Sequence, residues 1–356
     1  MIRAATEIEI GKWDELIKKN SDGGHIYNSF EWNEFKKTVD WQPHYLVFEQ
    51  AGYVMYFCMS SKSASFLGTI YYCAKGPGIF SNFKPDKVSM ARFKEFCSEL
   101  KSYVDMIDRK AILVKVEPEI HDSSCDMHQF GLHKSSSDLQ FKATIFVDLQ
   151  PTEEEILAGF KQKTRYNIGL AKRKGVEIKR LPVSEENIDL MFSMMSATQS
   201  RAGFFLRKKE YFAMYWKILA DADMGQLLAA CHESDVLAGI FATSFGAKGY
   251  YKDGGSYPLK RNLMAPYLLQ WEAMLWAKEQ GALSYDLVAV PPKAHLEDPD
   301  HPQAGLYQFK RGFNDEVTEF VGCWDLPISQ TKYRIWKRQE RQFLKLYSKM
   351  TKNLFW

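Results

Sequence analysis

Lys310 is the residue whose surroundings most favour chemistry. It lies in the string Gly305-Leu306-Tyr307-Gln308-Phe309-Lys310-Arg311-Gly312-Phe313, where an aromatic residue and a cation stand together between glycines. An ammonium group beside an apolar ring has a low local dielectric and can stabilise a developing oxyanion. The string therefore predicts a transferase-type site. The alternative is that Phe309 is a core residue and Lys310 a solvated surface lysine.

Asp286 and a pair of histidines are the other polar residues with a pattern that could serve chemistry. Asp286 lies in the predicted strand 284–290 and is a candidate to help remove the proton from an attacking amine, whose free pKa is roughly 10. Its alternative role is to cap the following loop. His295 and His301 share a loop with two aspartates and two prolines, and no third ligand is fixed on a strand or helix, so we predict no metal site.

The elements that must position these residues occur twice along the chain. Each copy has three extended stretches, a helix and a fourth strand, and the first copy covers 45–116 whereas the second covers 227–290. The predicted elements are strands 45–50, 53–60, one from Thr69, and 111–116 with helix 87–103, and then strands 227–232, 237–245, one ending at Ser256, and 284–290 with helix 265–280. Three antiparallel strands, a helix and a parallel strand form the core of the acetyltransferase-like (GNAT) fold.

We therefore predict an α+β chain of two tandem GNAT-like domains, with mixed, mostly antiparallel sheets and flanking helices. A length of 356 residues suits two hydrophobic cores. The predicted domains are 1–147, with the segment 322–356 packing on it, and 148–321. No long charged heptad segment interrupts the second domain, so a coiled-coil arm is not expected.

Two local patterns refine this picture. The stretch 260–265, which precedes the second repeat's helix, contains no glycine that would let backbone N–H groups close on a pyrophosphate. Acyl-CoA is therefore disfavoured as a donor, although Lys260 and Arg261 remain candidate phosphate ligands. Between the repeats, Thr152 and Glu155 form a capping box that predicts one helix running to Gly175.

The end of the chain carries most of the positive charge. The net charge is only +3, yet the segment 332–356 holds eight basic residues and one acid, Glu340. Basic residues at 334, 338, 341, 345, 349 and 352 share one helix face, and apolar residues at 333, 336, 343, 347, 350 and 354 occupy another. We predict an amphipathic helix that packs its aromatic face on the body. Contact of its basic face with anionic lipid or with RNA phosphate is the alternative.

Composition indicates a reduced, cytoplasmic protein. The six cysteines are scattered without a Cys-x-x-Cys pair, so they are expected to be reduced and mostly buried thiols. No apolar stretch approaches the length of a membrane-spanning helix, and Glu7 and Glu9 stand where a signal peptide would be apolar. The expected location is the cytoplasm, with peripheral contact at the inner face of the plasma membrane through the basic helix.

From about residue 27 to residue 324 the chain resembles the Fem aminoacyltransferases (FemABX family). This family attaches amino acids from aminoacyl-tRNA to the side-chain amine of the peptidoglycan stem peptide. The motifs that carry the resemblance are Trp32 with Phe35-Lys36, Lys75-Gly76-Pro77, Glu117-Pro118, Lys163-Thr164-Arg165-Tyr166-Asn167-Ile168, Arg207 with Glu210-Tyr211-Phe212, Tyr251 before Gly254-Gly255-Ser256, Tyr285-Asp286-Leu287, and the string 305–313.

The resemblance implies roles for named residues. Lys36 and Arg207 are expected to bind the diphosphate or a nearby carboxylate, and Tyr211 and Tyr251 to line the acceptor channel. The pair Phe309-Lys310 is expected beside the transferred acyl group as the catalytic pair. Trp32 and Asp286 complete the expected substrate-binding set.

The resemblance also implies the partners. Aminoacyl-tRNA is the expected co-substrate, with no cofactor and no metal, and the acceptor is UDP-MurNAc-pentapeptide or its lipid-linked form. A monomer is expected. Asp253 and the stretch 288–290 depart from the family pattern, which predicts an altered channel wall. Two other hypotheses stay open, namely an N-acyltransferase with a thioester donor, and a non-enzymatic protein that binds membrane or RNA through its last helix.

Overall fold

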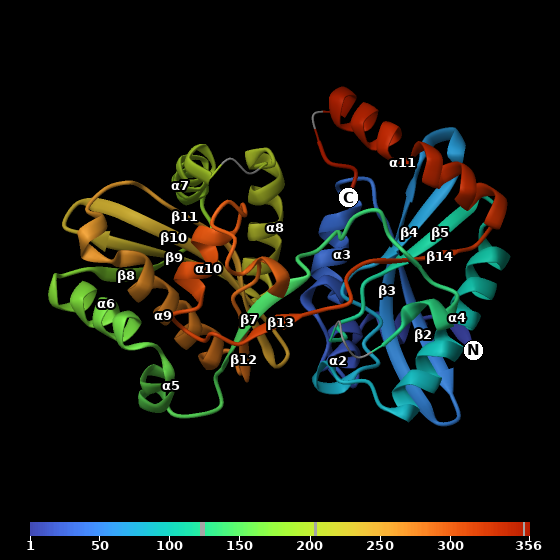
Figure 1. Cartoon of the computed structure of the whole chain (residues 1–356), viewed down its shortest axis with the longest axis horizontal. Helices are drawn as coiled ribbons and strands as arrows, with labels where there is room; N and C mark the ends of the chain where they lie inside the picture. Colours follow the sequence, from blue (N-terminus) through green and yellow to red (C-terminus); the bar gives the residue numbers. More distant parts are fainter. Residues whose placement is uncertain (122–124, 203–204, 352) are drawn as a thin grey trace. The chain divides into compact units, whose positions relative to one another are not determined.

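The computed structural model describes residues 1–121, 125–202, 205–351 and 353–356, which divide into two compact units (Figure 1). Unit 1 comprises Met1–Lys142 with Phe320–Trp356, and unit 2 comprises Ala143–Glu319. The sequence-based boundary after residue 147 falls inside strand β7 (Ala143–Asp148). Because β7 pairs with β12 (Ser284–Asp286) and β13 (Val317–Glu319), the whole strand belongs to the sheet of unit 2.

Unit 1 is built on a seven-stranded sheet of order β1-β2-β3-β4-β5-β14-β6. Strands β2, β3 and β4 are antiparallel neighbours, and β5 runs parallel to β4 after the crossover helix α4. This is the predicted repeat. The elements are β1 (Ile2–Ala4), β2 (Gln42–Gln50), β3 (Tyr53–Ser63), β4 (Thr69–Cys73), β5 (Ala111–Val116), β6 (His133–Lys134), β14 (Trp324–Pro327), α1 (Glu7–Ile10), α2 (Trp13–Ile17), α3 (Phe30–Lys37), α4 (Lys87–Ile107) and α11 (Gln330–Thr351).

Helices α4 and α11 cover opposite faces of this sheet. Tyr71 and Ala111 belong to the core cluster that includes α4, whereas their strand neighbours Ile70 and Ile112 pack with α11. Adjacent residues of a strand point to opposite faces, so the two helices lie on the two sides. The prediction that the last helix packs its aromatic face on the body is confirmed, because Trp336 is fully buried there.

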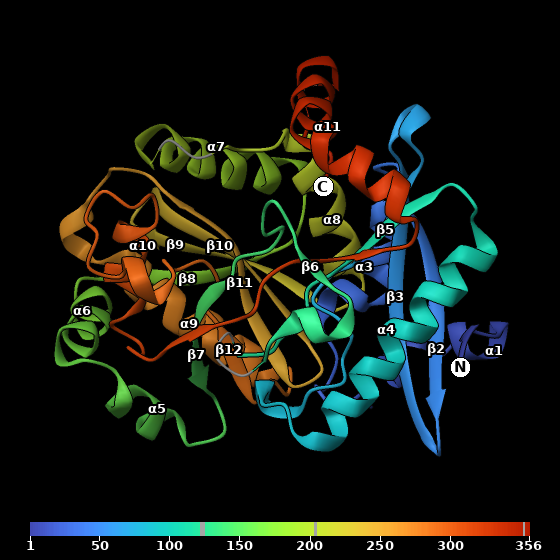
Figure 2. The same cartoon turned by 45° about the vertical axis from the view of Figure 1, so that its right-hand side comes forward.

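Unit 2 repeats the arrangement in a second seven-stranded sheet, of order β13-β7-β12-β11-β10-β9-β8. Helix α9 covers one face, and α7 and α8 cover the other (Figure 2). The remaining elements are β8 (Glu177–Leu181), β9 (Gly225–His232), β10 (Asp235–Phe245), β11 (Lys248–Ser256), α5 (Glu153–Gly159), α6 (Gln162–Arg173), α7 (Glu185–Ala202), α8 (Lys209–Asp221), α9 (Ala265–Glu279) and α10 (Ala304–Lys310). Strand β12 runs parallel to β11, as predicted for the second copy.

The helix predicted from Thr152 to Gly175 is two helices. The Thr152 side chain accepts from the Glu155 backbone N–H, which confirms the capping box at the start of α5. The chain then becomes extended at Phe160, with ψ 153°, and α6 starts at Gln162. The break is stabilised because the Phe160 ring is buried, and because Arg165 donates to the carbonyl oxygens of Ala158 and Phe160 that the break exposes.

Gly255 allows α7 to lie directly against β11, and we predict that alanine at this position destabilises unit 2. A Cβ atom there would lie 2.5 Å from the Met194 carbonyl carbon and 2.5 Å from the Met195 nitrogen, both backbone atoms of α7. Overpacking of this kind costs about 1–3 kcal/mol in free energy of unfolding, measurable by urea titration. Gly159→Ala is the matched control, since nothing lies within 4 Å of its Cβ position. Equal stability of the two variants would contradict the close approach.

Candidate active site

Lys310 is the last residue of α10, and its side chain is buried, with only 3% of the residue exposed. The Nζ atom donates to the backbone oxygens of Val288 at 2.6 Å and Ala289 at 3.1 Å, and it lies 5.3 Å from the centroid of the Tyr251 ring. The alternative of a solvated surface lysine is therefore wrong. The sequence predicted an amine beside an aromatic ring, and the ring that lies beside it is Tyr251.

The two carbonyl groups come from a turn that the sequence did not predict. The predicted strand 284–290 ends at Asp286, and Val288 and Ala289 have positive φ values of 53° and 48°. Such values are uncommon for residues other than glycine. The turn directs both carbonyl oxygens at the Lys310 amine, and nothing in a Val-Ala-Val string signals it beforehand.

Burial changes the ionisation of Lys310. Desolvation lowers the pKa of its amine to about 7, and the negative charge of Asp286 partly opposes this by raising it. Both the ammonium and the free amine are therefore populated near neutral pH.

We expect this shift to make unit 2 more stable as the pH rises. Unfolded Lys310 has a pKa of 10.5 and folded Lys310 one of about 7, so between these values the unfolded state binds more protons and the free energy of unfolding increases with pH. From pH 7 to pH 9 the gain is about 2 kcal/mol. Urea titration at both pH values measures it. Lys310→Met should lack the gain, and an equal gain in this variant would contradict the assignment.

Asp286 is the second polar group of this cluster. Its carboxylate accepts from the backbone N–H of Val288 at 2.7 Å and from the Thr144 hydroxyl. The role as a strand-end carboxylate that caps the following loop is confirmed by these bonds. Participation of Asp286 in substrate binding or proton removal stays a prediction.

Phe309 packs into the core of unit 2. Its ring lies 4.9 Å from that of Tyr267 and 5.3 Å from that of Phe313, measured between ring centroids. Because Phe309 and Lys310 are consecutive on a helix, their side chains leave the axis about 100° apart. Packing of Phe309 therefore fixes the rotation of α10 that buries the Lys310 amine. A contact of Phe309 with the acyl group stays a prediction.

A β-bulge separates Tyr251 from Asp253. Phe241 pairs with Asp253 and the next residue, Ala242, pairs with Tyr251, so Lys252 is an extra residue in β11. Tyr251 and Asp253 consequently point to opposite faces of the sheet. Tyr251 faces the Lys310 amine, and desolvation, assisted by the Asp253 charge, raises the pKa of its phenol to about 12.

Asp253 belongs to the α8 side of the sheet. Its carboxylate accepts from the Tyr215 hydroxyl and from the Trp216 indole N–H at 3.0 Å. Tyr211 lies on the same helix, with its ring 5.7 Å from that of Tyr215, and the Arg207 guanidinium stacks 4.5 Å above the Tyr211 ring. The structure thus places Arg207 and Tyr211 together, on the side opposite to the Tyr251 ring.

The two predicted site residues of unit 1 lie on α3. The Ser29 hydroxyl caps this helix by accepting from the Trp32 backbone N–H at 3.2 Å. The Trp32 ring is buried, 4.7 Å from the Tyr27 ring, whereas Lys36 is half-buried with its Nζ 5.5 Å from the Trp41 ring. A role in ligand binding stays a prediction for both residues.

Lys260, in the loop before α9, is already paired with acidic residues and is not available as a phosphate ligand. Its amine contacts the carboxylates of Glu233 at 2.7 Å and Asp235 at 2.9 Å. Met264 starts the helix in a left-handed conformation without a side-chain cap, and proline follows in the first turn, which removes a backbone donor. These features argue against the pyrophosphate of a CoA donor at this position.

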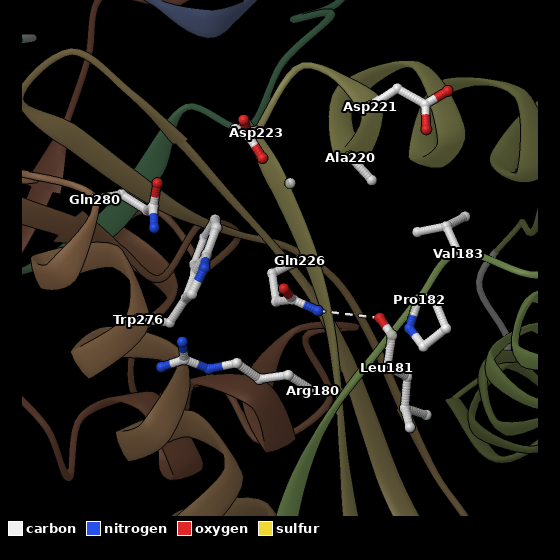
Figure 3. A pocket seen from close by; sticks show the side chains of 11 residues that line it. Arg180, Leu181, Pro182, Val183, Ala220, Asp221, Asp223, Gln226, Trp276 and Gln280 are labelled. Carbon is white, nitrogen blue, oxygen red and sulfur yellow. Dashed lines mark hydrogen bonds between the residues drawn. The ribbon is translucent and has the colours of Figure 1, made fainter.

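A cavity of about 450 Å³ lies elsewhere in unit 2, between β8 and the ends of α8 and α9 (Figure 3). Gln226 donates to the Leu181 backbone oxygen at 3.0 Å inside it, and Arg180 forms an ion pair with Glu279 at 2.7 Å. None of the predicted site residues lines this cavity. Among the described residues no group of three or more metal-ligating side chains is assembled, including around His295 and His301.

Comparison with known proteins decides the family. The profile of the FemAB family matches residues 122–231 and 221–340, which is more than half of the chain. The chain belongs to the FemAB family. Among the similar curated proteins, the lipid II:glycine glycyltransferases of Staphylococcus epidermidis and Staphylococcus haemolyticus are each 20% identical to it, and each alignment covers 96% of this chain and 97% of the relative.

Solved structures support the fold of this FemAB protein. The crystal structure of FemX superposes with a TM-score of 0.78 at 18% identity, covering 94% of this chain and 99% of that one. A conserved protein of unknown function from Bacteroides thetaiotaomicron superposes with a TM-score of 0.55 at 10% identity, covering 91% and 98%. The predicted α+β fold is confirmed. In the described part of unit 2 the longest helix is α7, with 18 residues, as expected without a coiled-coil arm.

Proposed function

We infer that this FemAB protein transfers an aminoacyl group to the side-chain amine of a peptidoglycan precursor and so builds the interpeptide bridge. The observation that carries this inference is the family match over residues 122–340, together with full-length similarity to glycyltransferases. The protein is accordingly an aminoacyltransferase. The donor, the form of the acceptor and the residue roles below are proposals.

Aminoacyl-tRNA is the proposed donor. Its ester is already activated, so the acceptor nitrogen can attack the ester carbonyl directly. The carbon–nitrogen bond forms, the ester carbon–oxygen bond breaks, and the ribose hydroxyl leaves with a proton that balances the one lost by the amine. This chemistry needs no cofactor.

Lys310 is the proposed catalytic residue. Its amine titrates near neutral pH, so the free form can accept a proton and the ammonium form can stabilise the oxyanion of the tetrahedral intermediate. The carbonyl groups of Val288 and Ala289 orient the amine in either form. The third hypothesis, a binding protein without chemistry, required Lys310 to face open solvent, and its burial argues against it.

A lipid-linked precursor is the proposed acceptor, because the curated relatives carry lipid II in their names. Either form of the precursor bears a diphosphate, which calls for cationic ligands. In unit 1 the candidates are Lys36 as the cation and Trp32 beside it. In unit 2 they are Arg207 with Tyr211 on one face of the sheet, and Tyr251 beside Lys310 on the other. We propose that the enzyme acts as a monomer on the cytoplasmic side of the membrane.

The test is transfer of label from a mixture of radiolabelled aminoacyl-tRNAs to two acceptors in parallel, UDP-MurNAc-pentapeptide and the lipid-linked precursor. Transfer to the lipid-linked form supports the whole proposal. Transfer to the nucleotide-linked form alone corrects the acceptor. No transfer to either would contradict the donor, and a thermal shift with CoA would then test the thioester alternative.

Lys36 should affect binding more than turnover. We expect Lys36→Met to raise the KM for the acceptor roughly ten-fold or more, with kcat changed little, since a diphosphate contact is equal in the ground and transition states. Lys37→Met is the control, because this neighbour on α3 is exposed and pairs with Glu34. Steady-state kinetics with purified acceptor measures both parameters. A fall in kcat at constant KM would contradict the role of Lys36.

A further inference from the structure

Helix α11 packs one face on the sheet of unit 1. Tyr333, Trp336 and Glu340 are buried, and Phe343 and Tyr347 pack beside Ile70 and Ile112. Glu340 is the helix's one acidic residue, and its carboxylate lies 3.4 Å from the Lys115 amine. The negative charge of the helix is therefore turned inward.

The outer face is a basic ridge, which we define as Arg334, Arg338, Arg341, Lys345 and Lys349. All five side chains are exposed, and they recur every three or four residues, so they lie along one side of the helix. Among the described residues none of the five has an acidic partner within ion-pair distance. Lys352, also expected on this side, lies outside the described residues.

An apolar flank runs beside the ridge, and we define it as Ile335, Leu346 and Met350. These residues are 45%, 57% and 75% exposed, in contrast to the buried aromatic residues of the same helix. With 100° per residue, the three side chains fall within about one sixth of a turn, between the buried face and the ridge. Large apolar side chains left in water beside unpaired cations indicate a surface that something else covers.

The combination of cationic and apolar side chains on α11 fits a lipid surface better than a nucleic acid. Anionic lipid headgroups attract unpaired lysine and arginine side chains, and the acyl region just beneath them accepts leucine and methionine. RNA phosphates would match the ridge alone and would leave the apolar flank in water. Among the described residues no helix is long and apolar enough to cross a bilayer.

We propose that the basic ridge and apolar flank of α11 form a docking surface for an anionic phospholipid bilayer. The ridge lies over the headgroups, and Leu346 and Met350 enter the boundary between headgroups and acyl chains. Because the aromatic face of α11 is already used by unit 1, the apolar contribution is small and charge supplies most of the attraction. Docking deepens the proposed function, since it brings the enzyme to the surface that carries a lipid-linked acceptor.

The test is co-sedimentation of the full chain with vesicles of phosphatidylglycerol in phosphatidylcholine, and with phosphatidylcholine alone. Lys345→Gln/Lys349→Gln should lower partitioning onto the anionic vesicles roughly 25-fold, at about five-fold per charge. Met350→Gln should lower it roughly five-fold. Raising the salt concentration should weaken binding of the wild-type protein, since exposed charges are screened.

Two control variants on the same unit match these changes. Lys94→Gln/Lys101→Gln removes two exposed lysines from α4, and Met106→Gln removes a methionine that is 67% exposed there. Both controls should bind like the wild type. Equal losses in test and control variants would overturn the proposal, because binding would then follow net charge and not this surface.

Two other results would also overturn it. One is the absence of binding to phosphatidylglycerol vesicles. The other is unchanged vesicle binding by Lys345→Gln/Lys349→Gln with weakened binding of aminoacyl-tRNA in a filter assay, which would assign the ridge to RNA. The vesicles contain no acceptor and the co-sedimentation assay contains no donor, so a failure to bind vesicles is distinguishable from a failure of the transferase assignment.

Discussion

Lys310→Met is expected to lower kcat by about two to three orders of magnitude while the KM for the acceptor changes less than three-fold. Methionine has similar length and fills the same buried space, but it has no charge to place beside an oxyanion and no basic nitrogen to accept a proton. The interaction lost exists only in the transition state, so turnover falls and binding does not. Steady-state kinetics with saturating aminoacyl-tRNA measures both parameters.

Lys278→Met is the matched control for this experiment. Its amine also donates to two backbone carbonyl groups of unit 2, those of Leu149 and Pro151, and it lies at the end of α9. Lys278→Met and Lys310→Met therefore each lose two hydrogen bonds to backbone carbonyl groups. If Lys278→Met lowers kcat as much as Lys310→Met does, the effect is structural. If neither variant lowers kcat, Lys310 has no catalytic role.

The repeated fold was predictable because its signals are local. Strand pairs such as β9 and β10 are joined by short polar turns. The helix that follows each third strand shows the helical periodicity of its apolar residues. Pairing between distant segments has no such signal. Strand β7 and strand β13 are far apart in the sequence but adjacent in one sheet, which is why the sequence-based boundary cut β7.

The candidate site was predictable at the level of residue type and not of geometry. Lys310 stood out because a cation and an aromatic residue are adjacent, but its burial and its two carbonyl partners depend on positive φ values at Val288 and Ala289. The sequence also gives no sign of the bulge at Lys252, although this bulge decides to which face of the sheet Tyr251 points. Backbone irregularities of this kind are set by tertiary packing and concentrate at functional sites.

Lys115 holds a second buried charge cluster, and its removal is expected to have the largest effect on stability. This residue of β5 is fully buried, with its amine 2.8 Å from Asp325 on β14, 3.4 Å from Glu340 on α11, and 2.5 Å from the Ser135 hydroxyl. Desolvation lowers the pKa of Lys115, but the charges of Asp325 and Glu340 outweigh it and the pKa ends above its ordinary value. The cluster joins the sheet to the helix that carries the basic ridge.

Lys115→Met should lower the free energy of unfolding by about 3–5 kcal/mol, because two buried carboxylates lose the buried cation between them. Their remaining cation is Lys337, which is half-exposed and lies 3.7 Å from Asp325 and 3.9 Å from Glu340. Urea titration of the variant measures this loss. Wild-type protein, in which Lys115 balances these carboxylates, is the reference for this loss.

Neutralising Asp325 and Glu340 as well distinguishes two causes of the lost stability, unbalanced buried charge and altered packing. The triple variant Lys115→Met/Asp325→Asn/Glu340→Gln leaves polar groups of the same shape with no buried carboxylate charge, and the remaining cation, Lys337, is half-exposed. It should therefore recover most of the stability lost by the single variant. If the triple variant is no more stable than Lys115→Met, the loss comes from packing around Trp336 and Tyr333 and not from unpaired charge. Recovery would establish that α11 is held to unit 1 by charge balance in the interior, which leaves its basic ridge unpaired at the surface.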